Sequence, residues 1–107
     1  MNRSTVKGLI FAASVMLGSS ALASSGLAVE EQFNLSCKAC HEQQVAGAPG
    51  LTDKEAWAPR IESGVDAMTQ TVLKGKGAMP PKGACFKCSD DEIKALVEHI
   101  ISIVEAN

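Results

Sequence analysis

The chain of 107 residues has room for one domain, and its 46% hydrophobic and 21% charged residues are typical of a globular protein. Its formal net charge of −2 disfavours nucleic acid as a partner. With 4% aromatic residues and no tyrosine, its core is small. A domain of this kind usually needs a disulfide, a metal or a large cofactor to be stable, so the four cysteines require an explanation.

Residues 1–23 have the pattern of a cleaved export signal. Arg3 and Lys7 give a positive start, the run 8–22 is uncharged and mostly apolar, and Ala21-Leu22-Ala23 has the small-x-small form of a cleavage site. We therefore expect a mature domain of residues 24–107 in the periplasm.

A retained membrane anchor is the alternative, because no charge occurs between residues 8 and 29 and a spanning helix needs only about 20 residues. Serine and glycine fill the second half of this run, which favours cleavage over anchoring. In an oxidising compartment, cysteines are expected to be paired, bound to a metal or otherwise capped.

The first elements after the leader read as helices. Residues 29–41 contain no glycine or proline and have apolar residues four apart, which predicts the first helix. Residues 46–50 form a loop of small residues with a proline. Thr52 can then cap a short helix that carries Trp57, and Pro59 should bend or end it.

The second half of the domain is also expected to be helical. Gly64 precedes a predicted helix over 65–74, and the glycines and prolines of 75–88 predict a shaped loop. Ser89 and Glu92 form a capping box at the start of the last helix. No strand pattern is present, so the sequence predicts an all-α fold.

The clearest chemical motif is Cys37-Lys38-Ala39-Cys40-His41. Two thiols at this spacing can add across the two vinyl groups of a haem, and the adjacent His41 can bind the iron as an axial ligand. A thioredoxin-like redox motif would need a strand before it and a βαβ context. A zinc site shared with Cys85 and Cys88 would need a much shorter spacing, of roughly 15 to 20 residues.

The second axial ligand is expected to be Met79. It lies in a loop whose small residues allow the backbone to approach a flat ring, and Pro80 favours an extended conformation at Met79. The other interpretation of Met79 is a side chain that fills a gap in the core. Met68 and His99 are the remaining candidates, and their patterns favour packing for Met68 and a partly exposed position for His99.

The chain resembles the class I cytochromes c, and more narrowly the bacterial cytochrome c5 type. The motifs that carry the resemblance are residues 37–41, Ala48-Pro49-Gly50, Ala56-Trp57-Ala58-Pro59-Arg60, residues 78–83, and Cys85 with Cys88 before an acidic helix start. The resemblance implies the class I cytochrome c fold, with about four helices wrapped around one covalently bound haem. It also implies that the first and last helices cross.

The resemblance further assigns roles to individual residues. Pro49 would offer its carbonyl to the His41 ring, and Cys85 and Cys88 would form a disulfide that stiffens the Met79 loop, with free thiols as the alternative. Ser89 rather than histidine follows the second pair, so no second haem is indicated.

Two further residues are expected near the haem propionates. Trp57 would donate its indole N–H to one, or simply pack against the ring, and Arg60 would pair with one. Class I cytochromes usually place an aromatic residue in the last helix where it meets the first. This chain has none there, and His99 is the candidate for that place.

Ligation by histidine and thioether would make the protein a one-electron carrier in a respiratory or related chain, not an enzyme, with no small-molecule substrate. Its partners would be redox proteins, among them a membrane-bound oxidase or reductase, and the protein itself a monomer or weak homodimer.

The expected docking face consists of four lysines with no acidic residue between them: Lys74, Lys76, Lys82 and Lys87. Rates of association with the partner that do not change with added salt would contradict a role of these lysines in docking. The other interpretation is that the lysines keep the loop soluble or balance the charge of the propionates.

Overall fold

The computed structural model describes residues 24–107, and the predicted leader of residues 1–23 lies outside the described part. Its elements in chain order are α1 (Val29–Ser36), α2 (Lys38–Gln43), a 3-10 helix (Val45–Gly47), α3 (Lys54–Ser63), α4 (Val65–Lys74), a second 3-10 helix (Pro81–Ala84) and α5 (Asp90–Ala106). Over this range the only β-type pairing is an isolated bridge between Lys76 and Met79. The predicted all-α fold is therefore confirmed.

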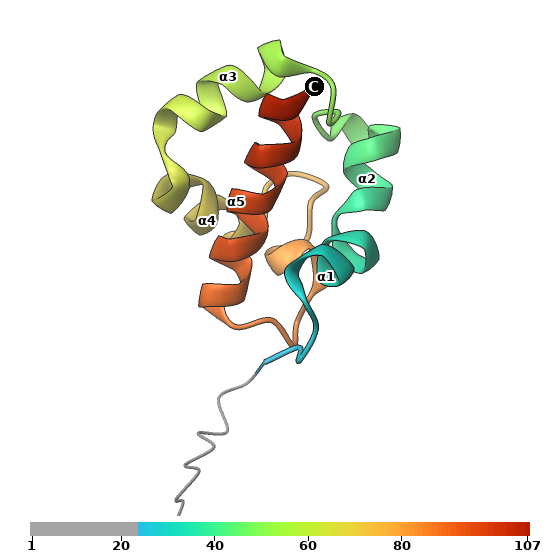
Figure 1. The fold of residues 1–107 in the computed structure, drawn as a ribbon, viewed down its shortest axis with the longest axis vertical. Coiled ribbons are helices and arrows are strands. Elements are labelled where there is room, and N and C mark those ends of the chain that lie inside the picture. The colour runs from blue at the N-terminus through green and yellow to red at the C-terminus, as the bar shows by residue number, and fades with distance from the viewer. Residues whose placement is uncertain (1–23) are drawn as a thin grey trace, which may run out of the picture.

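Helix α5 is the centre of the architecture. It runs through the middle of the molecule in Figure 1, with α1 and α2 on one side and α3 and α4 on the other. It packs against α1, α3 and α4. Its apolar face supplies half of the buried core, namely Ile93, Leu96, Val97, Ile100 and Val104, and the other buried apolar residues are Phe33, Trp57, Met68, Cys85 and Cys88.

Helices α1 and α5 meet through an aromatic contact. The rings of Phe33 and His99 lie edge to face, with centroids 5.1 Å apart and an interplanar angle of 68°. This arrangement is favourable because the edge of one ring meets the face of the other. His99 thus occupies the place in the last helix where the sequence offered no aromatic side chain.

The first predicted helix is wrong as a single element. Cys37 has φ −112° and separates α1 from α2, which continues to Gln43. The hydrogen bonds nevertheless pass through the break, since the Cys37 amide donates to Phe33 and its carbonyl accepts from His41. No glycine or proline marks this position, so the sequence carried no signal for the bend.

Helix α3 also differs from the expectation. Asp53 rather than Thr52 caps it, because the Asp53 carboxylate accepts a hydrogen bond from the Ala56 amide at 3.1 Å. Pro59 does not end the helix, which continues to Ser63. Pro59 is the sixth residue of α3 and has no N–H, so the hydrogen bond to the carbonyl four residues earlier is missing inside this helix.

The predicted boundaries of α4 and the cap of α5 are confirmed. Helix α4 spans Val65–Lys74 and buries Met68, as the packing interpretation of that residue predicted. At α5 the Ser89 hydroxyl accepts from the Glu92 amide, and the Glu92 carboxylate accepts from the Ser89 amide at 3.0 Å. Both halves of the capping box are thus present.

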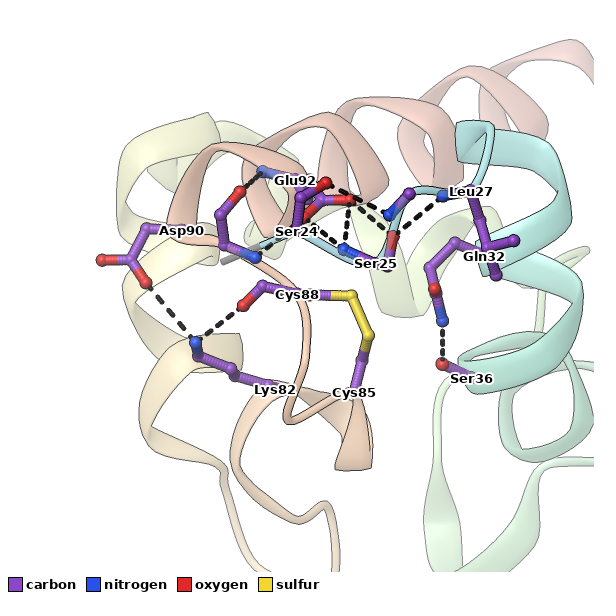
Figure 2. The surroundings of a disulfide bond; sticks show 12 residues. Ser24, Ser25, Leu27, Gln32, Ser36, Lys82, Cys85, Cys88, Asp90 and Glu92 are labelled. Carbon is purple, nitrogen blue, oxygen red and sulfur yellow. Dashed lines mark hydrogen bonds and ion pairs between the residues drawn. A yellow bond between two sulfur atoms is a disulfide. The ribbon is translucent and has the colours of Figure 1, made fainter. Parts of the chain in front are cut away.

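Glu92 also holds the segment before α1. Its carboxylate accepts hydrogen bonds from the Ser25 amide at 3.0 Å and from the Ser25 hydroxyl at 2.5 Å (Figure 2). Hydrogen bonds from Ser25, together with those from Ser89, lower the pKa of Glu92 to about 2. One carboxylate therefore joins the beginning of the described chain to the start of the last helix.

None of the helices in residues 24–107 combines the length and the apolar content needed to cross a membrane.

Replacing Glu92 should change the acid stability of the protein. Its pKa is lowered from an ordinary value of 4.5 to about 2 in the folded state, so the unfolded chain binds the proton first as the pH falls. The stability that Glu92 contributes is present above about pH 5 and is lost as the pH falls towards about 2. We expect Glu92→Gln to be less stable than wild type at neutral pH and to lose less stability on acidification.

Denaturant unfolding of the holoprotein at several pH values measures this difference. Glu98→Gln, an exposed glutamate of the same helix, is the control and should follow the wild-type pH dependence. If the free energy of unfolding changes with pH in the same way for Glu92→Gln and wild type, the role of Glu92 is contradicted.

Candidate haem-attachment site

His41 is held in a defined orientation. It lies on α2 with 8% of its surface exposed, and its Nδ1 atom is 3.0 Å from the carbonyl oxygen of Pro49. When Nδ1 carries the proton and donates to this carbonyl, Nε2 has a free lone pair for a metal. The Pro49 contact that the resemblance implied thus selects Nε2 as the ligating atom.

Trp57 fixes the loop that orients His41. Its indole N–H donates to the Gly50 carbonyl at 2.7 Å, and its ring centroid lies 5.5 Å from that of His41. The single indole donor is thus used within the protein here, and the expected hydrogen bond from Trp57 to a propionate stays a prediction. The packing interpretation of Trp57 agrees with its burial, since only 4% of the residue is exposed.

Arg60 is exposed on α3, and its guanidinium donates to the Ala56 carbonyl of the same helix. The structure thus places this side chain along its own helix, one turn towards the N-terminus. Pairing of Arg60 with a propionate stays a prediction.

Cys37 and Cys40 are free thiols at the junction of α1 and α2. Cys40 is exposed, whereas Cys37 is partly buried against the core. Burial, with a smaller effect from neighbouring Cys40, raises the pKa of Cys37 to about 11. The Cys37 sulfur is therefore a neutral S–H group at neutral pH.

The loop between α4 and α5 presents Met79. The Met79 amide donates to the Lys76 carbonyl and the Lys76 amide donates to the Met79 carbonyl, both at 3.0 Å. Gly75, with φ +79°, allows this turn, because a Cβ atom there would lie 2.8 Å from both the Met79 carbonyl oxygen and the Pro81 nitrogen. A side chain at this position would therefore force the loop apart.

Gly83 lies near both the end of the Met79 side chain and the end of α1. A Cβ atom built on Gly83 would lie 3.7 Å from the Met79 Cε methyl and 3.8 Å from the carbonyl oxygen of Ser36. Ser36 is the last residue of α1 and precedes Cys37. The loop that follows Met79 thus lies beside the end of α1.

Cys85 and Cys88 are joined in a disulfide, with Cα atoms 5.4 Å apart. Both residues are buried, and Figure 2 shows the bridge below the N-terminal end of α5. These sulfurs are bonded to each other and so offer no thiolates for a zinc site with Cys37 and Cys40.

One of the expected docking lysines has a different role. Lys82 Nζ donates to the Cys88 carbonyl at 2.8 Å and lies 3.8 Å from a carboxylate oxygen of Asp90 (Figure 2). Lys74, Lys76 and Lys87 are exposed. Lys82 therefore differs from the other three lysines of the predicted docking face, and the face itself stays a prediction.

The residues present fit a c-type haem. Two free thiols precede a buried histidine that keeps Nε2 for the iron, and the loop that carries Met79 lies beside the end of α1, directly before Cys37. Sequence reasoning identified these residues but missed Gly50 as the acceptor for Trp57 and Lys82 as a contact of the disulfide loop. A carbonyl acceptor has no residue type that would reveal it, and a lysine in a basic segment looks like its neighbours.

Comparisons with known proteins agree with this site. A sequence profile described as cytochrome C oxidase, cbb3-type, subunit III matches residues 24–100. Cytochrome c-555 of Chlorobaculum tepidum is 32% identical over 100 residues, which cover 90% of this chain and 93% of that protein. Cytochrome c5 of Azotobacter vinelandii is 44% identical over 63 residues, which cover 57% of this chain and 76% of that protein.

A solved structure is also similar. It is titled an electron transfer complex of nitrite reductase with cytochrome c, and the matched chain has a TM-score of 0.66 and 43% sequence identity. The match covers 70% of this chain and 91% of that chain. The likeness therefore extends over nearly all of the other molecule.

Gly75→Ala should displace the loop that carries Met79. Its φ of +79° and ψ of 162° lie in a region that is open almost only to glycine, and the added Cβ would collide with two backbone atoms. We expect a loss of about 3 kcal/mol or more in the free energy of unfolding. Gly77→Ala is the control, because Gly77 also has positive φ but nothing within 4 Å of the built Cβ.

The control should cost only about 1 kcal/mol, the ordinary penalty of a side chain in the left-handed region. Denaturant unfolding of both variants measures the difference. Equal losses for the two variants would mean that the close approach at Gly75 does not hold the loop.

Proposed function

Because the chain belongs to the class I c-type cytochromes of the c5 type, we propose that it is a periplasmic one-electron carrier with a single haem c ligated by His41 and Met79. The observation that carries this proposal is a pair of free thiols beside an oriented histidine, with Gly83 near both the Met79 methyl and the end of α1. The relatives are electron-carrier cytochromes, and the protein is a carrier rather than an enzyme.

Cys37 and Cys40 would hold the haem through thioether bonds, and His41 would bind the iron through Nε2. The bound haem supplies iron that cycles between the ferric and ferrous states. The hydrogen bond from Nδ1 to Pro49 keeps the imidazole ring from turning and makes Nε2 a stronger donor. Trp57 holds the carbonyl of the next residue, Gly50, so the loop cannot move away from His41 without breaking a buried hydrogen bond.

Met79 would supply the second protein ligand of the iron. A thioether is a soft ligand that favours ferrous iron, and two protein ligands leave no open position for oxygen or a substrate. The disulfide between Cys85 and Cys88 and the paired backbone of Lys76 and Met79 support this assignment, because both restrict the loop that delivers the sulfur.

The proposal also includes export of the protein and docking to a redox partner. The family match begins at residue 24, which supports a mature domain of residues 24–107 after a cleaved leader. The similar complex of a cytochrome c with nitrite reductase supports a redox protein as the partner. Lys74, Lys76 and Lys87 would attract an acidic patch on that partner. The protein would act as a monomer or weak homodimer.

Absorption spectroscopy of the purified exported protein tests the haem assignment. We expect a low-spin c-type spectrum that does not change when carbon monoxide is added to the reduced protein, because both axial positions are filled. In Met79→Ala one axial position of the iron would be open, and carbon monoxide should bind there and shift the spectrum. Met68→Leu, at the other methionine of residues 24–107, should behave as wild type, since Met68 is buried in the core.

Carbon monoxide binding to the wild type would contradict stable ligation by Met79. A protein without haem absorption would contradict the whole assignment.

A further inference from the structure

Lys82 differs from the other lysines of the loop because its ammonium group is used inside the molecule. Its Nζ donates to the Cys88 carbonyl at 2.8 Å and lies 3.8 Å from the Asp90 carboxylate. The Lys82 side chain is 28% exposed, against 76% for that of Asp90. A charged donor on a half-buried carbonyl makes one of the stronger kinds of hydrogen bond.

The backbone at Lys82 adopts a conformation that side chains avoid. Lys82 has φ 59°, and Gly83 and Ala84 follow with φ of 58° and 66°. A left-handed turn of this length needs external support, because each non-glycine residue in it is strained. The contact between Lys82 and Cys88 spans this turn and ties its first residue to the far end of the disulfide loop.

The same turn lies near the end of Met79. Lys82 comes three residues after Met79, and the Gly83 amide donates to Pro80 at 3.0 Å. The Cβ position of Gly83 is 3.7 Å from the Met79 methyl. A movement of the turn at Lys82 and Gly83 therefore moves the Pro80 carbonyl, which follows Met79 directly in the chain.

From these contacts we infer that Lys82 is a positioning residue for Met79: its ammonium group fastens the left-handed turn to the Cys88 carbonyl and so keeps the thioether directed at the iron site. The inference rests on the proposed ligation by Met79. Asp90 plays a smaller part, because its carboxylate is more exposed and lies farther from the ammonium group.

Lys82→Met tests this role. Methionine keeps a long unbranched side chain and the same backbone strain but cannot donate to Cys88. We expect the far-red absorption band of methionine-ligated ferric haem to be lost on heating before the helices melt, and added carbon monoxide, which leaves the wild-type spectrum unchanged, to shift the spectrum of the reduced variant. The melting of the helices, followed by circular dichroism, separates loosened ligation from a general loss of fold.

Lys87→Met is the matched control. It removes the same charge from the same loop, and within residues 24–107 Lys87 makes no side-chain hydrogen bond or ion pair. Lys82→Arg should restore the far-red band and a spectrum that carbon monoxide does not change, because arginine keeps a charged donor. If Lys82→Met matches Lys87→Met in both readouts, the inference is wrong although the ligation by Met79 stands.

A wild-type protein that lacks the far-red band would instead overturn the Met79 ligation and this inference together. If Lys82→Met does not accumulate as holoprotein, Lys82→Gly gives the same comparison with the backbone strain relieved. Looser methionine ligation in Lys82→Gly supports the role of the ammonium group. Ligation as firm as in wild type contradicts it.

Discussion

The hydrogen bond between His41 Nδ1 and the Pro49 carbonyl determines which nitrogen of the ring can bind a metal. Several other features of the structure serve this one contact. Trp57 holds the neighbouring Gly50 carbonyl, and burial of His41 keeps water from competing for Nδ1. The Asp53 cap starts the helix that carries Trp57 directly after this loop. The histidine is thus oriented by a chain of contacts that begins at the cap of α3.

The opposite side of the site is built differently. No regular element carries Met79; the residue lies in a loop held by paired backbone hydrogen bonds with Lys76, by the close approach at Gly75 and by the disulfide. A loop held in this way can deliver a side chain firmly although it lacks a helix or sheet. Helix α5 joins the two sides, since it packs on α1 and its N-terminus follows the disulfide directly.

Much of the fold followed from the sequence because local chemistry determined it. The capping box at Ser89, the two glycines that flank α4 and the apolar face of α5 each act within a few residues, and the structure has them where the pattern predicted. The break at Cys37 and the passage of α3 through Pro59 were missed. The break at Cys37 has no glycine or proline to mark it, and the proline in α3 removes a hydrogen bond without ending the helix.

In the candidate site, too, the features set by local sequence were predicted and the contacts of side chains with backbone carbonyls were not. The free cysteines, His41 and Met79 were found because their residue types and spacing reflect haem chemistry. The hydrogen bond of Trp57 with Gly50 and the contact of Lys82 with Cys88 were not, since each joins a common donor to a backbone carbonyl that any residue could provide. Supporting contacts of this kind become visible only when the chain is folded.

The most direct test of the account is a proton NMR spectrum of the reduced, diamagnetic holoprotein with the methionine methyl groups labelled. A methyl group held over the haem plane by an iron–sulfur bond experiences the ring current and shifts far upfield. The account predicts one such resonance, absent from Met79→Ala and present in Met68→Leu. A spectrum with no shifted methyl group, or one whose shifted resonance disappears with Met68, would contradict the assignment of Met79 to the iron.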